Sequence, residues 1–89
     1  MLFRSIDHLG IAVKSVDQAL QFYEAQLGLS VSLREIVEKE KVSVAMLPLG
    51  EPRIELLEAS APDSVIAKFI EKRGEGLHHV ALKIGRAHV

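Results

Sequence analysis

Hydrophobic and polar residues alternate in two short stretches near opposite ends of the chain. The first stretch is Ile6 to Val13 (IDHLGIAV) and the second is Leu77 to Ile84 (LHHVALKI). Such alternation is typical of β-strands, in which successive side chains point to opposite faces. When the two stretches are aligned, His79 falls on the position of His8. We therefore predict an internal repeat built on two strands that each carry a histidine.

Small residues share one face of each predicted strand with the histidine. Alternation puts His8 on the same face as Gly10 in the first strand, and His79 on the same face as Ala81 in the second. His78 is then expected on the opposite face of its strand, among bulky aliphatic residues. A histidine beside small residues leaves room on that face for a ligand.

Between these two strands, the pattern predicts a helix, three strands and a second helix. Ser15 and Gln18 have the spacing of a capping box, and Gly28 stands where a glycine commonly ends a helix. The first helix has an apolar stripe at Val16, Ala19, Leu20, Tyr23 and Leu27. Three strands are expected as an antiparallel meander over residues 29–38, 42–49 and 53–58. The second helix is expected from Asp63 or Ser64 to Arg73.

Composition limits the chain to one small domain without an obvious nucleic-acid or membrane role. Its 89 residues are 48% hydrophobic and 26% charged, with a formal net charge of −1 and no cysteine. Lysine and arginine are scattered among acids, so the basic footprint of a nucleic-acid binder is missing. No apolar run approaches the roughly 20 residues of a membrane span, and we expect a cytoplasmic protein. Without cysteine, only histidine and carboxylate remain as plausible metal ligands.

Glu55 is an acid at a position where the pattern predicts burial, between Ile54 and Leu56. A buried carboxylate is costly unless it is paired, protonated or bound to a cation. Together with His8 and His79, it could supply two nitrogens and one oxygen to zinc, cobalt, nickel, manganese or iron, with positions left for water or substrate. The spacing is equally compatible with two hydrogen-bonded strand histidines and an edge-strand acid that bind nothing.

Three segments of the chain carry a family resemblance. Residues 7–13 (DHLGIAV), the hairpin that runs from 47–50 (LPLG) to 54–57 (IELL), and residues 76–82 (GLHHVAL) closely resemble the methylmalonyl-CoA epimerases. That family belongs to the vicinal oxygen chelate superfamily, with glyoxalase I, extradiol dioxygenases and fosfomycin-resistance proteins. The resemblance implies an α+β fold of paired βαβββ modules around a metal. One complete module is expected at about 2–58, and the start of a second at about 63–83.

The resemblance also implies a ligand set and a reaction. His8, Glu55 and His79 would bind a divalent metal (cobalt, zinc, nickel, manganese or iron), with His78 as the alternative at the last position and a fourth ligand, a glutamate, further along. The reaction would be epimerisation of methylmalonyl-CoA, by proton removal and return beside the thioester through a metal-stabilised enolate. The implied partners are an acyl-CoA thioester and a second copy of the full-length chain in a homodimer.

Several features of the implied reaction stay open. An acid is common in the turn before the third strand of such modules; Lys39 occupies that position, and Glu38 or Glu40 could replace it, although the simpler interpretation is that both are solvated turn charges. A glyoxalase I-type lyase would use the same metal geometry. A metal-free binding protein of the bleomycin-resistance kind would share the fold.

The last six residues, 84–89 (IGRAHV), are what a widely used sequencing adapter encodes in one reading frame before a stop codon. We therefore expect the native sequence to end near Lys83, in a domain of residues 1–83 with a non-native tail. A second module cut short in this way would leave a strand edge unpaired. A chain made as written is expected to be weakly folded or oligomeric, with little or no activity.

Overall fold

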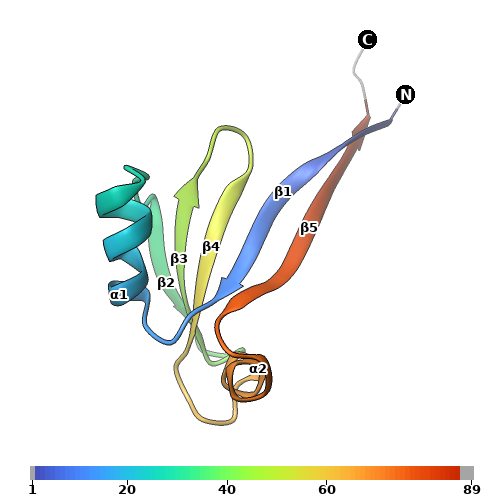
Figure 1. The fold of residues 1–89 in the computed structure, drawn as a ribbon. Helices are drawn as coiled ribbons and strands as arrows, with labels where there is room; N and C mark the ends of the chain where they lie inside the picture. Colours follow the sequence, from blue (N-terminus) through green and yellow to red (C-terminus); the bar gives the residue numbers. More distant parts are fainter. Residues whose placement is uncertain (1, 87–89) are drawn as a thin grey trace.

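Residues 2–86, the part of the chain that this computed structural model describes, form a five-stranded sheet with helices on both faces (Figure 1). In chain order the elements are β1 (Leu2–Ala12), α1 (Val16–Leu20), the π-helix η1 (Gln21–Gln26), β2 (Leu33–Val37), β3 (Val42–Pro48), β4 (Arg53–Ala59), α2 (Val65–Arg73) and β5 (Gly76–Arg86). The predicted tail is thus divided, since residues 84–86 continue β5 and residues 87–89 lie outside the described part.

The order of strands in the sheet is β2-β3-β4-β1-β5. The β2, β3 and β4 strands form the predicted antiparallel meander, while β1 lies parallel to β4 after the crossover through α1. The β5 strand pairs antiparallel with β1, and Figure 1 shows this long pair reaching away from the meander. The predicted α+β class is confirmed, and so is the βαβββ arrangement from β1 to β4, in which α1 and η1 together form the helical segment.

Two hydrophobic clusters lie on opposite faces of the sheet, and each is covered by one helix. Alternate residues of β3 supply both clusters, as a period of two requires: Ala45 and Leu47 pack toward α1, whereas Val42 and Val44 pack toward α2. From the helices, Val16 and Ile66 are buried at 0% and 3% exposure. The sheet is therefore buried on both faces around its middle strands.

The first predicted helix differs from a regular α-helix in its second half. Its N-terminus is as expected, because the Gln18 amide donates to the Ser15 hydroxyl at 3.2 Å. Beyond Leu20 the chain forms a π-helix, in which an amide donates to the carbonyl five residues earlier, as the amide of Leu27 does to Phe22. The wider turn rotates Leu27 off the apolar stripe, which explains its 53% exposure.

The first meander strand begins four residues later than predicted. The amide of Leu29 donates to the carbonyl of Tyr23, so this residue completes the helix end and does not join the sheet. Leu29 and Val31 still pack against the cluster beneath α1, which accounts for their apolar character. The second helix begins as predicted, with the Ser64 hydroxyl accepting from the Ala67 amide at 3.0 Å.

Apolar side chains remain exposed on β5, the edge strand of the described sheet: Leu77, Val80, Leu82 and Ile84. An edge with unpaired backbone groups and apolar side chains favours pairing with another chain. Within residues 2–86, no helix is both long enough and apolar enough to cross a bilayer.

We expect the chain to self-associate through β5, with the associated fraction rising with concentration in analytical ultracentrifugation. Replacing Leu82 and Ile84 together by lysine should shift the chain toward monomer, because charge on an edge strand opposes pairing. Val65→Lys is the matched control, since Val65 is equally exposed but lies on α2. A parent chain that stays monomeric at every concentration would contradict the expectation.

Candidate metal centre

The pairing of β1 with β5 brings the two repeated histidines into contact. In this antiparallel register, His8 lies opposite Ala81 and His79 lies opposite Gly10, so all four side-chain positions share one face. The Nε2 atoms of His8 and His79 are 3.1 Å apart, and the rings meet edge to face with centroids 5.1 Å apart. Two positions 71 residues apart in the sequence thus point their Nε2 atoms at one another.

Gly10 makes this approach possible because the His79 ring lies directly over its backbone. A Cβ atom built on Gly10 would lie 2.2 Å from Cε1 and 2.6 Å from Nε2 of His79, which is far inside van der Waals contact. Any other residue at this position would push the ring away from His8. The small-residue face predicted from the sequence therefore accommodates an imidazole of the neighbouring strand.

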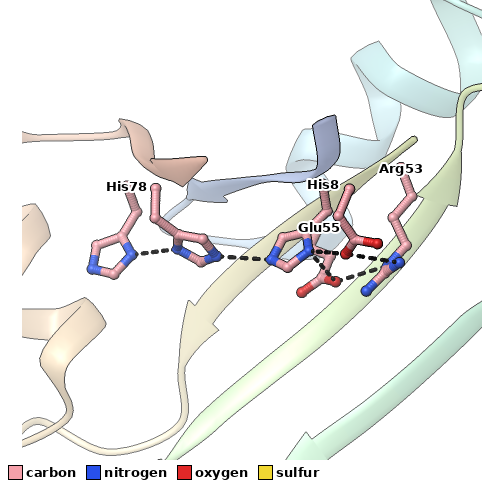
Figure 2. A network of polar contacts seen from close by, with 6 residues as sticks. His8, Arg53, Glu55 and His78 are labelled. Atoms are coloured by element: carbon pink, nitrogen blue, oxygen red, sulfur yellow. Dashed lines mark hydrogen bonds and ion pairs between the residues drawn. The ribbon is translucent and has the colours of Figure 1, made fainter. Parts of the chain in front are cut away.

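A bulge precedes each histidine and changes the direction of one side chain. On β1 the register shifts between Ile6 and His8, which leaves Asp7 as an extra residue. On β5 it shifts between Leu77 and His79, which leaves His78 as an extra residue. A bulge re-aims side chains that would otherwise alternate between faces. The prediction that His78 faces away from His79 is wrong for this reason, since their Nδ1 atoms are 2.8 Å apart (Figure 2).

Glu55 lies beside His8 on the same face of the sheet, as Figure 2 shows. It pairs with Gly10 in the parallel register of β1 and β4, is 9% exposed, and has its Oε2 atom 3.7 Å from Nδ1 of His8. The predicted burial is confirmed, and the cost of burying the charge is offset by Arg53, whose Nε donates to Oε2 at 2.8 Å. Sequence reasoning missed Arg53, although it lies two positions before Glu55 and so on the same strand face.

The two histidines fit a shared cation better than Glu55 does in this conformation. Nitrogens bound to one cation at about 2.0–2.1 Å lie roughly 3.0–3.4 Å apart, depending on the coordination geometry. The separation of 3.1 Å between the two Nε2 atoms falls in that range. Across the described residues, no three histidine or carboxylate side chains are grouped closely enough to enclose a metal. The carboxylate of Glu55 is held by Arg53 and lies nearer Nδ1 of His8, so it must turn to join the two rings.

The electrostatics of the site favour the protonation states that a metal requires. Partial burial lowers the pKa of His79, and the neighbouring His78 and His8 lower it further against a smaller opposing effect of Glu55. Its imidazole is therefore neutral near pH 7. The hydrogen bond from His8 lowers the pKa of Asp7, and the Arg53 cation adds to that effect. Asp7 is thus an ionised acceptor at Nδ1 of His8, and Nε2 of His8 is left available.

Glu38 and Glu40 lie apart from the histidines, in the exposed turn between β2 and β3. Glu40 lines a cavity of about 240 Å³ that His78 also reaches, whereas Glu38 is not among its lining residues. The other lining residues are aliphatic: Val37, Val42, Val44, Leu57, Val65 and Ile66. Of the two acids, Glu40 therefore has the better access to the face that carries the histidines.

A sheet of this topology with paired histidines on one face defines the class of protein. The model of the Glyoxalase/Bleomycin resistance protein/Dioxygenase superfamily matches residues 7–88, and the chain belongs to that superfamily. Its relatives include methylmalonyl-CoA epimerases. Human mitochondrial methylmalonyl-CoA epimerase is 35% identical over 80 residues, which are 89% of this chain and 46% of that protein.

Two solved structures resemble the fold closely. A hypothetical protein from Bacillus halodurans is 47% identical, with a TM-score of 0.87 over 89% of this chain and 57% of that one. A variant of Streptomyces coelicolor methylmalonyl-CoA epimerase, in complex with 2-nitronate-propionyl-CoA, is 38% identical, with a TM-score of 0.84 over 88% of this chain and 58% of that one. The uncharacterised protein YqjC of Bacillus subtilis is 47% identical over 76 residues. The chain spans about half the length of the curated relatives it matches.

Gly10→Ala should separate the two histidine rings, because the new methyl group would occupy the space of the His79 ring. We expect a loss of about 1–3 kcal/mol in the free energy of unfolding, as for other overpacked sites, measured by urea denaturation. Nuclear Overhauser contacts between the two rings should disappear. The matched control is Ala81→Gly at the symmetric position, which should keep those contacts and cost no more than about 1 kcal/mol. Retained contacts in the alanine variant would show that Gly10 is not required.

Proposed function

We propose that this chain supplies the first part of the active site of a metal-dependent epimerase acting on methylmalonyl-CoA. The observation that carries the proposal is the Nε2 pair of His8 and His79, 3.1 Å apart, with Glu55 beside His8 on the same face of the sheet. The named activity of several relatives supports the same substrate, since they are methylmalonyl-CoA epimerases at 31–35% identity over 80 residues or more.

His8, His79 and Glu55 would hold the divalent cation in this proposal. When bound, the cation withdraws charge from the thioester carbonyl and stabilises the negative charge that develops as the neighbouring carbon loses its proton. Asp7 keeps the His8 ring oriented through its bond of 2.8 Å to Nδ1. Arg53 holds the carboxylate of Glu55 beside His8, through its bond of 2.8 Å to Oε2, until Glu55 is required as a ligand.

Epimerisation also needs groups that remove and return the proton. We assign one of these roles to Glu40, because it lines the cavity that reaches His78, which in turn contacts His79 at 2.8 Å. The aliphatic lining of this cavity suits the alkyl substituent of the acyl group and limits access of water. Glu38 does not line the cavity and is assigned no role.

The proposed activity is tested by exchange of the α-proton of methylmalonyl-CoA in D₂O, followed by proton NMR. Because the relatives are about twice as long, we would compare this chain alone with a chimera of residues 1–83 and the remainder of the Bacillus subtilis relative. The chimera should catalyse exchange, lose the activity with a chelator and regain it with cobalt or zinc. His8→Ala and His79→Ala should abolish both metal binding and exchange.

The same preparations would be assayed with methylglyoxal and glutathione. Lyase activity without α-proton exchange would replace the proposed function by a glyoxalase I-type reaction. A chimera that folds, binds no metal and exchanges no proton would overturn the proposal and favour a binding protein.

Glu40→Gln in the chimera should lower the exchange rate by about 10²–10⁴-fold, the usual contribution of a positioned acid or base, while metal affinity stays unchanged. Glu38→Gln is the matched control, since it removes the same charge from the same exposed turn, and it should retain the parent rate. Equal rates for both variants would remove Glu40 from the proposed mechanism.

A further inference from the structure

The two halves of the histidine site are related by a local twofold axis between β1 and β5. Leu9 pairs with Val80 at the axis, and the pairs on either side exchange with one another: His8 with Ala81, and His79 with Gly10. These are the same positions that the internal repeat aligns. The two bulges obey the same symmetry, since Asp7 and His78 each come directly before the histidine of their strand.

Four side chains consequently form a line of three polar contacts across this axis (Figure 2). Oδ2 of Asp7 is 2.8 Å from Nδ1 of His8, and the central contact between the two Nε2 atoms is 3.1 Å. Nδ1 of His79 is 2.8 Å from Nδ1 of His78. Each ring of the central pair is therefore held at Nδ1 by the bulge residue of its own strand. The two bulge residues differ in chemistry, because a carboxylate only accepts whereas a neutral imidazole can donate or accept.

Hydrogen-bond donors and acceptors fix the protons along this line when no cation is present. Ionised Asp7 requires a proton on Nδ1 of His8, so Nε2 of a neutral His8 has none. The contact of 3.1 Å then needs a proton on Nε2 of His79. Nδ1 of His79 is consequently an acceptor, and the proton in its contact with His78 belongs to His78.

A cation bound between the two rings requires a different arrangement. Nε2 of His79 must give up its proton to become a ligand, and a neutral His79 then carries that proton on Nδ1. His78 must accept where it donated before, with its own proton moved from Nδ1 to Nε2. The two rings keep the same total number of protons in both arrangements, so this exchange releases none.

We propose that His78 is a reversible positioning residue, which donates to His79 in the empty site and accepts from it in the metal-bound site. Asp7, its symmetry mate, holds His8 in a single tautomer in both states. The inference rests on the metal-binding part of the proposed function. It explains why the second bulge carries a histidine, since a carboxylate there could serve only the metal-bound arrangement.

The direct test is the tautomer of each ring in the ¹⁵N-labelled 89-residue chain, read from long-range ¹H–¹⁵N NMR correlations at pH 8. Without metal, we expect the proton of His79 on Nε2 and that of His78 on Nδ1. Zinc should move the first to Nδ1 and the second to Nε2, while His8 keeps its proton on Nδ1. An unchanged tautomer of His79 with and without zinc would overturn the inference.

Two variants of His78 separate hydrogen bonding from packing. His78 packs edge to face on Phe69 with centroids 4.9 Å apart, and H78F keeps an aromatic ring there without any hydrogen bond. H78F should weaken zinc binding about 10-fold or more in calorimetric titration, as expected for loss of a partner to a ligand histidine. H78N places an amide that can donate or accept at the same distance along the side chain, and it should restore most of the affinity. Equal affinity of H78F and the parent chain would contradict the proposed role.

The results also separate this inference from the proposed function. Zinc binding with the expected tautomer exchange, but without epimerase activity in the chimera, would overturn the function alone. A parent chain that binds no zinc at any concentration would overturn both. Should H78F fail to fold by circular dichroism, the tautomers of the parent chain and the affinity of H78N still decide the question.

Discussion

The antiparallel pairing of β1 with β5 is the constraint on which the candidate site depends. It places His8 opposite Ala81 and His79 opposite Gly10, and thus sets two rings from distant parts of the sequence 3.1 Å apart. A slip of one residue would send one histidine to the other face of the sheet. The register is held by 11-residue strands on both sides, and by a bulge before each histidine.

Buried charge beside the histidines is the second element of the site. Glu55 is 9% exposed and is stabilised by Arg53, which also lies 3.4 Å from Asp7. One guanidinium thus stabilises two carboxylates that both lie near Nδ1 of His8. A cation bound by Glu55 would replace Arg53 as the positive charge that offsets the desolvation of this buried carboxylate. The helix α2 and its hydrophobic cluster lie on the same face, so the site is built against a packed part of the molecule.

Much of the architecture follows from local patterns in the sequence. The alternation around His8 and Glu55 located two strands and the buried face, and the cap at Ser15 located a helix start. The repeat aligned His8 with His79, and the structure relates these positions by a twofold axis. Alternation failed at His78 because a bulge depends on how two strands pair, which a single strand does not reveal. The apolar stripe likewise did not reveal the π-helix that exposes Leu27. The partnership of Arg53 with Glu55 is local, since the two side chains are two positions apart on one strand face, and period-two alternation could have predicted it.

The central claim is that His8, His79 and Glu55 converge on one cation. Anomalous diffraction at the cobalt edge, from crystals of the chain grown with cobalt, tests this claim most directly. We predict a single strong peak bound by Nε2 of both histidines, with the Glu55 carboxylate turned from Arg53 toward it. A peak bound through Nδ1, a peak elsewhere on the chain, or histidine rings in contact with no cobalt between them would contradict it.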